Sequence, residues 1–235
     1  QVLGRANKYF LSSCKKILCY NRNIINFPKN LLNKMVIINP LVRENVYKFK
    51  SLDRIKDKFT ILIVGGSQSA SIFNMNLKNT IINISKKKPI KIIQQTNKEN
   101  VSCLRDFYLK NGVENKIFNF ENDFENIIKD ADLCITRSGA STLAELSLMN
   151  IPFIAVPLPS SKDNHQLENS YFYKKNDCCW VIEQINFEKK IEHLLNEILT
   201  DKIDYLKKKE NLKKLNYQNT WINVNQKILE IINEN

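Results

Sequence analysis

Six short aliphatic segments, each followed by a stretch with helical spacing, constrain the fold more than any other feature of this chain. The aliphatic segments occupy residues 59–64, 90–95, 116–120, 132–136, 152–157 and 179–183. The helical stretches cover residues 70–86, 98–110, 123–129, 141–149, 164–175 and 187–199. Nearly continuous aliphatic runs are typical of parallel strands whose two faces are both covered by helices. The alternation therefore predicts an α/β domain built on a doubly wound, Rossmann-like parallel sheet.

The regions on either side of this alternation are less regular. Before it, the sequence predicts a helix, two short strands and a charged linker or short helix, at residues 5–15, 16–20, 35–39 and 50–58. After it, the spacing of apolar residues predicts two further helices, at 202–215 and 217–233. The chain begins with Gln rather than Met, so we expect it to be N-terminally truncated.

Composition and charge argue against several classes of protein. No apolar run reaches the roughly 18 residues that a membrane-spanning helix requires, and the start QVLGRANKYF lacks the apolar core of a signal peptide. The net charge of +12 would suit nucleic acid, anionic lipid or a phosphorylated substrate. Lysine is spread over the whole chain, however, and no nucleic-acid-binding motif is present. We therefore expect no nucleic-acid partner.

Cysteine and histidine are placed in a way that does not suggest a metal site. The six cysteines show no CxxC spacing, and the two histidines have no neighbours at metal-ligand spacing. Cys178 and Cys179 lie in the apolar stretch CCWVI, which indicates small buried residues on a strand. We expect reduced thiols in a cytoplasmic protein, and neither a metal nor another cofactor.

The stretch GGSQS, residues 65–69, follows the first strand of the alternation and holds two of only five glycines in the chain. Glycine permits positive φ and lets a ligand approach the backbone closely. The helix that starts behind it offers unpaired N–H groups to an anion. The stretch is consistent with a phosphate or diphosphate site, and equally with a tight turn that binds nothing.

A second loop, TRSGASTLAEL at residues 136–146, also leads from a strand into a helix, with Gly139 at the turn. Ser138, Ser141 and Thr142 are possible helix caps. Glu145 lies one turn into the helix, where a carboxylate stabilises the helix dipole. Alternatively, its two oxygens could accept hydrogen bonds from the vicinal hydroxyls of a ribose.

A third loop, PLPSSKDNHQLENS at residues 157–170, brings His165, Gln166 and Asn169 to the start of a helix. Amide side chains donate and accept hydrogen bonds, as sugar hydroxyls require, although the pattern is also that of an ordinary polar first turn. Ligands of open parallel sheets bind at the carboxyl ends of the strands. Taken together, the three loops predict a pocket for a nucleotide-diphosphate sugar.

In order and spacing, GGSQSA, TRSGASTLAEL and KDNHQLENS resemble the C-terminal half of the MurG family, within glycosyltransferase family 28. LGRANKYF and INPLVR are similar to family segments further upstream, so the resemblance covers most of the chain. It implies a two-domain GT-B fold with an acceptor-binding and a donor-binding domain. On this basis we expect a remnant of the acceptor domain, a linker, the donor domain and a helix that packs back toward the acceptor domain, at residues 1–38, 39–58, 59–215 and 216–235.

The resemblance further implies inverting transfer of N-acetylglucosamine from UDP-N-acetylglucosamine to lipid I (undecaprenyl-diphospho-muramoyl-pentapeptide), a step of peptidoglycan synthesis. Such an enzyme is peripheral to the cytoplasmic face of the bacterial inner membrane and serves cell-wall biogenesis, cell shape and cell division. The resemblance places the catalytic base upstream of this chain, so we assign none and expect this chain to be inactive alone.

By resemblance, each loop takes one part of the donor. Arg43 would approach the diphosphate, Ser67 would bind a phosphate oxygen, and Glu145 would bind the ribose. The first turn of the helix in the second loop would hold the nucleotide, through Ala140, Ser141, Thr142, Leu143 and Ala144. Gln166, with His165 and Asn169 nearby, would select the sugar hydroxyls, and the backbone near Glu121 would contact the uracil edge.

Some positions depart from the family, and other functions stay open. The family usually has Gly where Ser69 stands, and Ile38 replaces the linker glycine while Leu41 is inserted before Val42 and Arg43, which puts the register of Arg43 in question. The chain could instead be the sugar-nucleotide subunit of a two-chain glycosyltransferase, or a nucleotide-sugar-binding module without catalysis. A flavodoxin-like or dinucleotide-binding domain is disfavoured because G-x-G-x-x-G does not follow the first strand.

Overall fold

The computed structural model describes residues 3, 5–48, 57–65, 70–216 and 219–233. Most of the expected linker 50–58 and Gly66 to Ser69, with the candidate Ser67, lie outside the described residues.

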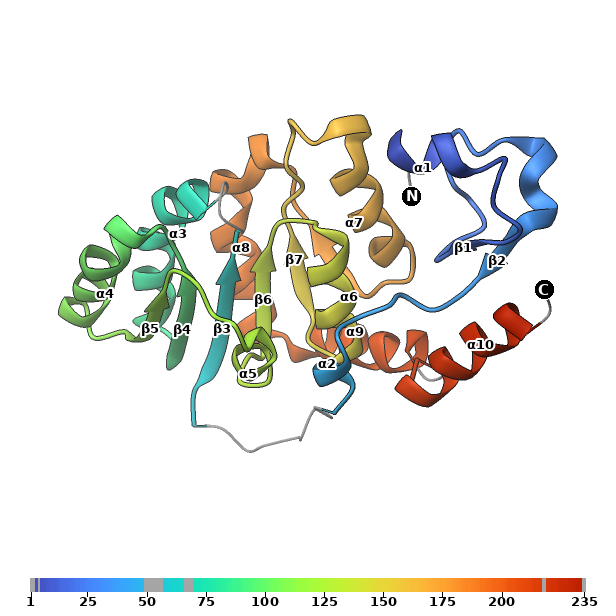
Figure 1. The fold of residues 1–235 in the computed structure, drawn as a ribbon. Coiled ribbons are helices and arrows are strands. Elements are labelled where there is room, and N and C mark those ends of the chain that lie inside the picture. The colour runs from blue at the N-terminus through green and yellow to red at the C-terminus, as the bar shows by residue number, and fades with distance from the viewer. Residues whose placement is uncertain (1–2, 4, 49–56, 66–69, 217–218, 234–235) are drawn as a thin grey trace.

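A six-stranded, fully parallel sheet forms the centre of the α/β domain (Figure 1), in the order β5-β4-β3-β6-β7-β8. The strands are β3 (Phe59–Val64), β4 (Ile90–Gln95), β5 (Glu114–Phe118), β6 (Leu133–Thr136), β7 (Phe153–Ala155) and β8 (Cys179–Val181). The chain runs outward from β3 to β5 and then returns to pair β6 with the other side of β3. The prediction of a doubly wound parallel sheet is therefore confirmed, and its switch point lies between β3 and β6.

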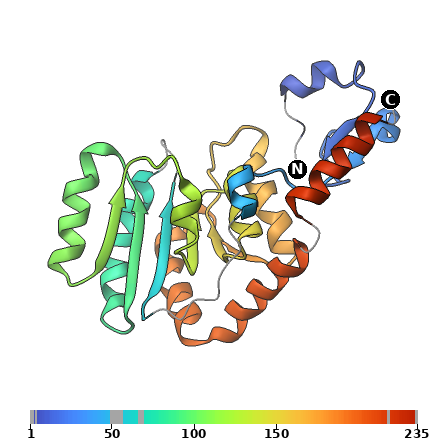
Figure 2. The same cartoon turned by 60° about the horizontal axis from the view of Figure 1, so that its bottom comes forward.

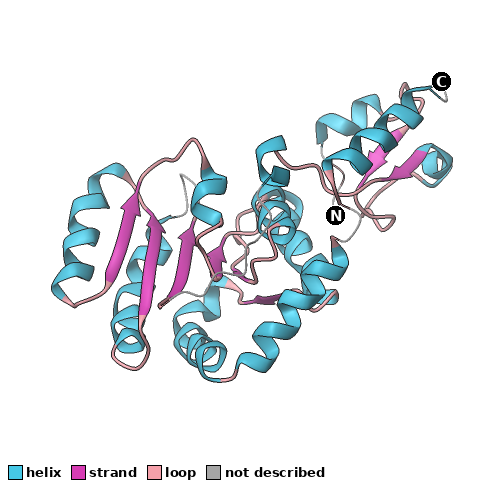
Figure 3. Cartoon of the chain, turned by 90° about the horizontal axis from the view of Figure 1, so that it is seen from below, coloured by secondary structure: helices cyan, strands magenta, loops and turns pink. Residues whose placement is uncertain are grey.

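Helices cover both faces of the sheet (Figure 3). The helices that connect or follow the strands are α3 (Ala70–Ser85), α4 (Val101–Lys110), α5 (Phe124–Ile128), α6 (Ala140–Leu148), α7 (His165–Lys175), α8 (Phe187–Thr200) and α9 (Lys202–Leu215). Short 3-10 turns at Lys98–Asn100, Lys162–Asn164 and Gln184–Asn186 precede α4, α7 and α8.

The two cores follow from the period-two geometry of β3. Ile61 and Ile63 point into one buried cluster, together with side chains of α3, α4 and α8. Leu62 and Val64 point into the other, with side chains of α5, α6 and α7. Since both faces are buried, the strand shows a continuous aliphatic run rather than an alternation.

The structure corrects the sequence-based bounds at several elements. The strand expected at 152–157 is Phe153–Ala155, and the helix expected at 217–233 is Trp221–Asn233. The strand expected at 116–120 is β5, Glu114–Phe118. It is an edge strand that starts with a carboxylate, and Glu114 forms ion pairs with Lys58 and Lys91 at 2.9 and 3.0 Å. The helix expected over 5–15 is shorter, since α1 spans only Arg5–Phe10.

A smaller unit lies beside the α/β domain (Figure 2). It contains α1, a parallel pair of strands, β1 (Ile17–Cys19) and β2 (Met35–Ile37), and a 3-10 helix at Lys29–Lys34. A short helix that the sequence did not predict, α2 (Glu44–Lys48), follows. The C-terminal helix α10 (Trp221–Asn233) lies next to β1 and β2 in both views.

Residues around the start of α10 join it to the segment after β2. The Tyr47 hydroxyl donates to Asn219 Oδ1 at 3.2 Å, and the rings of Tyr47 and Trp221 lie 5.6 Å apart. Further along α10, Ile222, Leu229 and Ile232 are exposed. Among the described residues, no helix combines the length and the apolar character needed to cross a bilayer.

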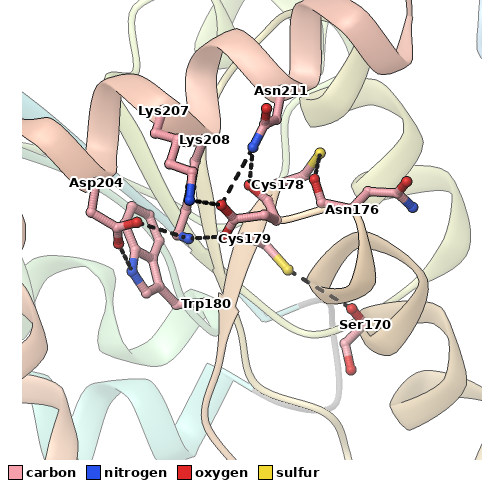
Figure 4. Close-up of polar contacts among 10 residues, drawn as sticks. Ser170, Asn176, Cys178, Cys179, Trp180, Asp204, Lys207, Lys208 and Asn211 are labelled. Carbon is pink, nitrogen blue, oxygen red and sulfur yellow. Dashed lines mark hydrogen bonds and ion pairs between the residues drawn. The ribbon is translucent and has the colours of Figure 1, made fainter.

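Helix α9 is fastened to the start of β8 by a buried lysine (Figure 4). Lys208, whose side chain is only 6% exposed, donates to Asp177 at 2.7 Å and pairs with Asp204 at 3.2 Å. Its ammonium also lies 4.9 Å from the centre of the Trp180 ring, and Trp180 Nε1 donates to Asp204 at 2.8 Å. A buried ammonium is tolerated when carboxylates and an aromatic face replace its hydration.

The cysteines agree with the expectation of free thiols, since all six are unpaired and Cys178 and Cys179 are buried at β8. Burial raises the pKa of the Cys178 thiol to about 11.

We predict that Asp177→Asn lowers the free energy of unfolding by about 1–2 kcal/mol at pH 7, because Lys208 loses a charged partner. Asn tolerates the positive φ of 51° at this position, so the substitution isolates the charge. The hydrogen bond from Lys208 lowers the pKa of Asp177. A lowered carboxyl pKa stabilises the fold above the unfolded-state value of about 3.9.

The difference between the variant and the native chain should therefore shrink as the pH falls through the lowered pKa of Asp177. Urea unfolding at several pH values measures it. Asp106→Asn, an exposed change on α4, is the control and should have little effect. A loss for Asp177→Asn that is independent of pH would contradict the prediction.

Candidate functional site

A pocket of about 360 Å³ opens at the carboxyl ends of the central strands, at the switch point between β3 and β6. Its floor is formed by the last residues of these strands and the residues just after them, Val64, Gly65, Thr136 and Arg137. Its remaining lining comes from β4, the β5–α5 connection and the starts of α6 and α7: Gln95, Phe118, Phe120, Glu121, Phe124, Gly139, Thr142 and Gln166. Two of the three predicted loops therefore meet at one cavity, together with the described part of the first.

The start of α6 faces this pocket without a capping side chain. Gly139 is the N-cap residue and has no side chain that could accept from the first-turn N–H groups. The sequence had offered Ser138, Ser141 and Thr142 as caps, but no side-chain cap is formed. The N–H groups of Ala140, Ser141 and Thr142, at the positive end of the helix dipole, make this helix start suited to an anion.

Gln166 and Asn169 connect the second and third loops through hydrogen bonds. Gln166 Oε1 accepts from the backbone N–H of Ser138 at 3.2 Å and of Leu158 at 3.0 Å. Asn169 Nδ2 donates to the Ser138 carbonyl at 3.0 Å. Both residues lie on one face of α7, one turn apart at most. Their first role in the structure is therefore to hold the Ser138 backbone at the pocket.

The carboxylate of Glu145 is almost completely buried, and Arg43 covers it. Arg43 Nε donates to Glu145 Oε1 at 2.9 Å and Arg43 Nη2 to Oε2 at 3.4 Å, so both carboxylate oxygens are engaged. This hydrogen bond raises the pKa of Arg43. Glu145 follows Thr142 by three residues and thus shares its face of α6, next to the pocket that Thr142 lines.

A second carboxylate, which the sequence did not single out, lies beside the same arginine. Glu125, on α5, is only 3% exposed, and its Oε2 lies 3.6 Å from Arg43 Nη2. That oxygen has no hydrogen-bond partner. Arg43 also points Nη1 at the Asn122 carbonyl, 3.5 Å away. The structure therefore surrounds Arg43 with acceptors from α6 and from the segment 122–125.

Arg137 is a further site residue that sequence reasoning passed over, although it stands in the quoted stretch TRSGASTLAEL. It is 7% exposed and donates to the Val156 carbonyl at 3.2 Å and to Gln184 Oε1 at 2.8 Å. Its guanidinium lies 5.5 Å from the centre of the Phe73 ring. Burial lowers the pKa of Arg137. Since no acidic side chain of the described chain forms an ion pair with it, its positive charge adds to the potential of the pocket it lines.

The other predicted residues lie at various distances from this pocket. Glu121 lines it and forms an ion pair with Lys116 at 3.6 Å. Leu143 is fully buried in the core, so only its backbone is available to a ligand, and Ala144 is also buried. His165 is exposed, and its Nδ1 lies 2.7 Å from the Lys162 carbonyl. His165 borders a different cavity, of about 810 Å³, between α7 and the smaller unit of α1, β1 and β2, called the N-terminal unit below.

Within the described ranges, no group of three or more His, Cys, Asp or Glu side chains is arranged to hold a metal ion.

The sequence profile of the glycosyltransferase family 28 C-terminal domain matches residues 60–220, which is most of the chain. Two curated relatives share the name UDP-N-acetylglucosamine--N-acetylmuramyl-(pentapeptide) pyrophosphoryl-undecaprenol N-acetylglucosamine transferase. The protein of Pelagibacter ubique (strain HTCC1062) is 46% identical over 236 residues, covering 100% of this chain and 66% of the relative. That of Rickettsia canadensis (strain McKiel) is 37% identical over 208 residues, covering 86% of this chain and 59% of the relative.

A solved structure shares the fold. The crystal structure of Acinetobacter baumannii MurG superposes with a TM-score of 0.74 at 21% identity, covering 100% of this chain and 64% of that chain. The α/β domain described above therefore has the Rossmann-like architecture of the C-terminal domain of that GT-B protein.

We predict that Gln166→Leu lowers the free energy of unfolding by about 1–2 kcal/mol, because two backbone N–H groups lose their acceptor. Gln166→Glu keeps acceptor oxygens at the same reach and places a negative charge near the start of α7, where the helix dipole favours it. It should therefore stay close to the native stability. Equal losses in the two variants, measured by urea unfolding, would mean that the acceptor oxygen is not what matters at this position.

Proposed function

Because this chain belongs to the family of glycosyltransferase family 28 C-terminal domains, we propose that it binds UDP-N-acetylglucosamine. It would form the donor-binding part of an enzyme that transfers N-acetylglucosamine to lipid I and yields lipid II. The names of the Pelagibacter and Rickettsia relatives support this donor and this acceptor. This chain spans 66% and 59% of the length of those two relatives, so we propose the activity for the longer protein.

One observation carries the donor assignment: a buried carboxylate lies one turn behind an uncapped helix start at the sheet's switch point. The N–H groups at Ala140 to Thr142 suit the diphosphate. The two oxygens of Glu145 suit the two ribose hydroxyls. The two sites are about one helical turn, roughly 5 Å, apart, so one nucleotide can reach both.

Gly139 supports a close approach of the diphosphate to the backbone. Its backbone angles, φ −66° and ψ 132°, are open to any residue. Among the described residues, a Cβ built at this position would meet only Thr142 Oγ1, at 3.9 Å. Neither the backbone conformation nor the packing of the described residues therefore requires glycine here, whereas a ligand lying against the backbone would.

The rest of the pocket provides for the base and the sugar. The aromatic residues Phe118, Phe120 and Phe124 line the side next to Glu121, where we place the uracil, with its edge toward the backbone. Gln166 uses its oxygen for the loops, so its amide NH₂ group is the part we assign to a sugar hydroxyl. Asn169 and His165 lie further out and would contact the sugar only at its far side.

The reaction that we propose is a single displacement at the anomeric carbon. The acceptor hydroxyl forms the new C1–O bond, the bond to the UDP oxygen breaks, and the configuration inverts. This chain would position the donor and stabilise the charge that develops on the leaving diphosphate, through the helix start and Arg43. The proton of the acceptor hydroxyl needs a base, which we place in the part of the family that precedes this chain.

We further propose that the enzyme acts as a peripheral protein at the cytoplasmic face of the inner membrane. Lipid I carries its sugar on a membrane-bound polyprenyl diphosphate, so the donor must be brought to a lipid surface. The net charge of +12 favours contact with anionic headgroups.

Calorimetric titration of the chain with UDP-N-acetylglucosamine tests the donor site. We expect Glu145→Gln to weaken binding about tenfold, since hydrogen bonds to a charged group are lost. The native chain should prefer UDP over 2′-deoxy-UDP, and the variant should lose this preference. Glu188→Gln, on the exposed first turn of α8, is the matched control and should bind like the native chain.

A folded chain that binds neither UDP-N-acetylglucosamine nor UDP would overturn the proposal. Binding alone would leave a non-catalytic module or a two-chain enzyme as alternatives. Transfer to a lipid I analogue, measured with and without a separately supplied acceptor domain of the Pelagibacter relative, separates them. Transfer only in the mixture supports a donor part of a larger transferase, and none in either case favours a binding module.

A further inference from the structure

The Glu145 carboxylate that should bind the ribose is already occupied in the free chain. Both of its oxygens accept from Arg43, at 2.9 and 3.4 Å, and the Glu145 side chain is only 8% exposed. A ribose diol needs these same two oxygens. Because so little of the carboxylate is exposed, we expect the donor and Arg43 to compete for Glu145, so that a nucleotide binds by displacing the guanidinium.

Glu125 is placed to take over the displaced arginine. Its side chain is 4% exposed, and its Oε2 lacks a hydrogen bond although it lies only 3.6 Å from Arg43 Nη2. A buried carboxylate oxygen without a partner is costly. A small shift of the guanidinium away from α6 would give that oxygen a hydrogen bond. The Asn122 carbonyl, 3.5 Å from Nη1, lies on the same side.

On the basis of the donor function proposed above, we propose that Arg43 changes partners when the donor binds. It leaves Glu145 for Glu125, so that Glu145 becomes free for the ribose and the guanidinium stays at the pocket rim, near the diphosphate. Glu125 is then a positioning residue, since it acts on the donor only through Arg43.

The exchange links the donor site to the N-terminal unit. Arg43 immediately precedes α2, whose Val46 is buried in the same core cluster as Leu143 and Leu146 of α6. Through Asn219, which contacts both Tyr47 and the Pro40 carbonyl, the same segment also holds the start of α10. Binding of the donor would thus change the contacts of the segment that joins the two units.

Uridine is the probe that separates the two roles of Arg43, because it carries the diol but no phosphate. We expect Arg43→Gln to tighten uridine binding about threefold to fivefold, since the competitor for Glu145 is gone. The same variant should bind UDP-N-acetylglucosamine more weakly, because the cation near the diphosphate of this ligand is removed. Binding of 2′-deoxyuridine, measured by NMR titration alongside, should change much less, because it cannot use both carboxylate oxygens.

Glu125→Gln should weaken uridine binding of the native chain about twofold to threefold, because the displaced guanidinium loses its second carboxylate. In the Arg43→Gln background, it should have no effect. Glu188→Gln removes the same charge on the exposed first turn of α8 and is the matched control. If Glu125 had a merely structural role, Glu125→Gln would change the affinity for uridine equally in the native chain and in the Arg43→Gln variant.

The two proposals fail in different ways. If Arg43→Gln leaves the affinity for uridine unchanged or lowers it, while UDP-N-acetylglucosamine still binds in a Glu145-dependent way, the partner exchange is wrong. The proposed donor site is then unaffected. An equal effect of Glu125→Gln with and without Arg43 would also refute the exchange. If no variant of the folded chain binds uridine, UDP or the sugar nucleotide, the donor site itself is wrong.

Discussion

The parallel pairing of β3 with β6 is the constraint on which the candidate site depends. The register sets Val64 opposite Thr136, so the chain leaves both strands at the same level of the sheet. Because β3 continues toward β4 on one side and β6 toward β7 on the other, their connections diverge and leave a crevice between them. The pocket, the start of α6 and the buried Arg137 all lie at this point. A shift of one residue in this register would turn the aliphatic side chains of β3 to the wrong cores.

Around this crevice, polar side chains form hydrogen bonds with backbone groups of the loops rather than with one another. Gln166 and Asn169 bind the backbone of Ser138, and Arg137 binds the carbonyl of Val156. Such contacts satisfy buried polar groups of loops that have no ladder partners. They also fix the start of α6 relative to α7, as the proposed diphosphate site requires. Gln166 and Asn169, which the sequence suggests as ligand-binding residues, therefore hydrogen-bond the loop backbone first. A side chain can hold the backbone with one polar atom and contact a ligand with the other.

Much of this architecture was predictable, because burial on both faces leaves a strong mark in a sequence. The runs around Ile61, Ile92 and Ile135 predicted their strands, and the turns after them predicted the edge of the sheet that carries the site. The sequence predicts the start of β5 two residues too late, because Glu114 is typical of a loop, and its ion pairs with Lys58 and Lys91 exist only in the folded chain. The five-residue helix α2 has too few turns to show a helical period, so its formation depends on the burial of Val46.

By itself, the sequence determined the kind of fold, the edge of the sheet at which the candidate site lies, and the types of group available there. Local periodicity and turn formation depend on residues that are close in sequence, so they can be predicted without a structure. Only the tertiary structure decided that Arg43 contacts Glu145, 102 positions away along the chain. It also decided that Glu125 Oε2 lies 3.6 Å from Arg43 Nη2 without a hydrogen bond. Such pairings depend on how helices from separate β-α units pack across the sheet, and nothing in the local sequence of either partner encodes that distance.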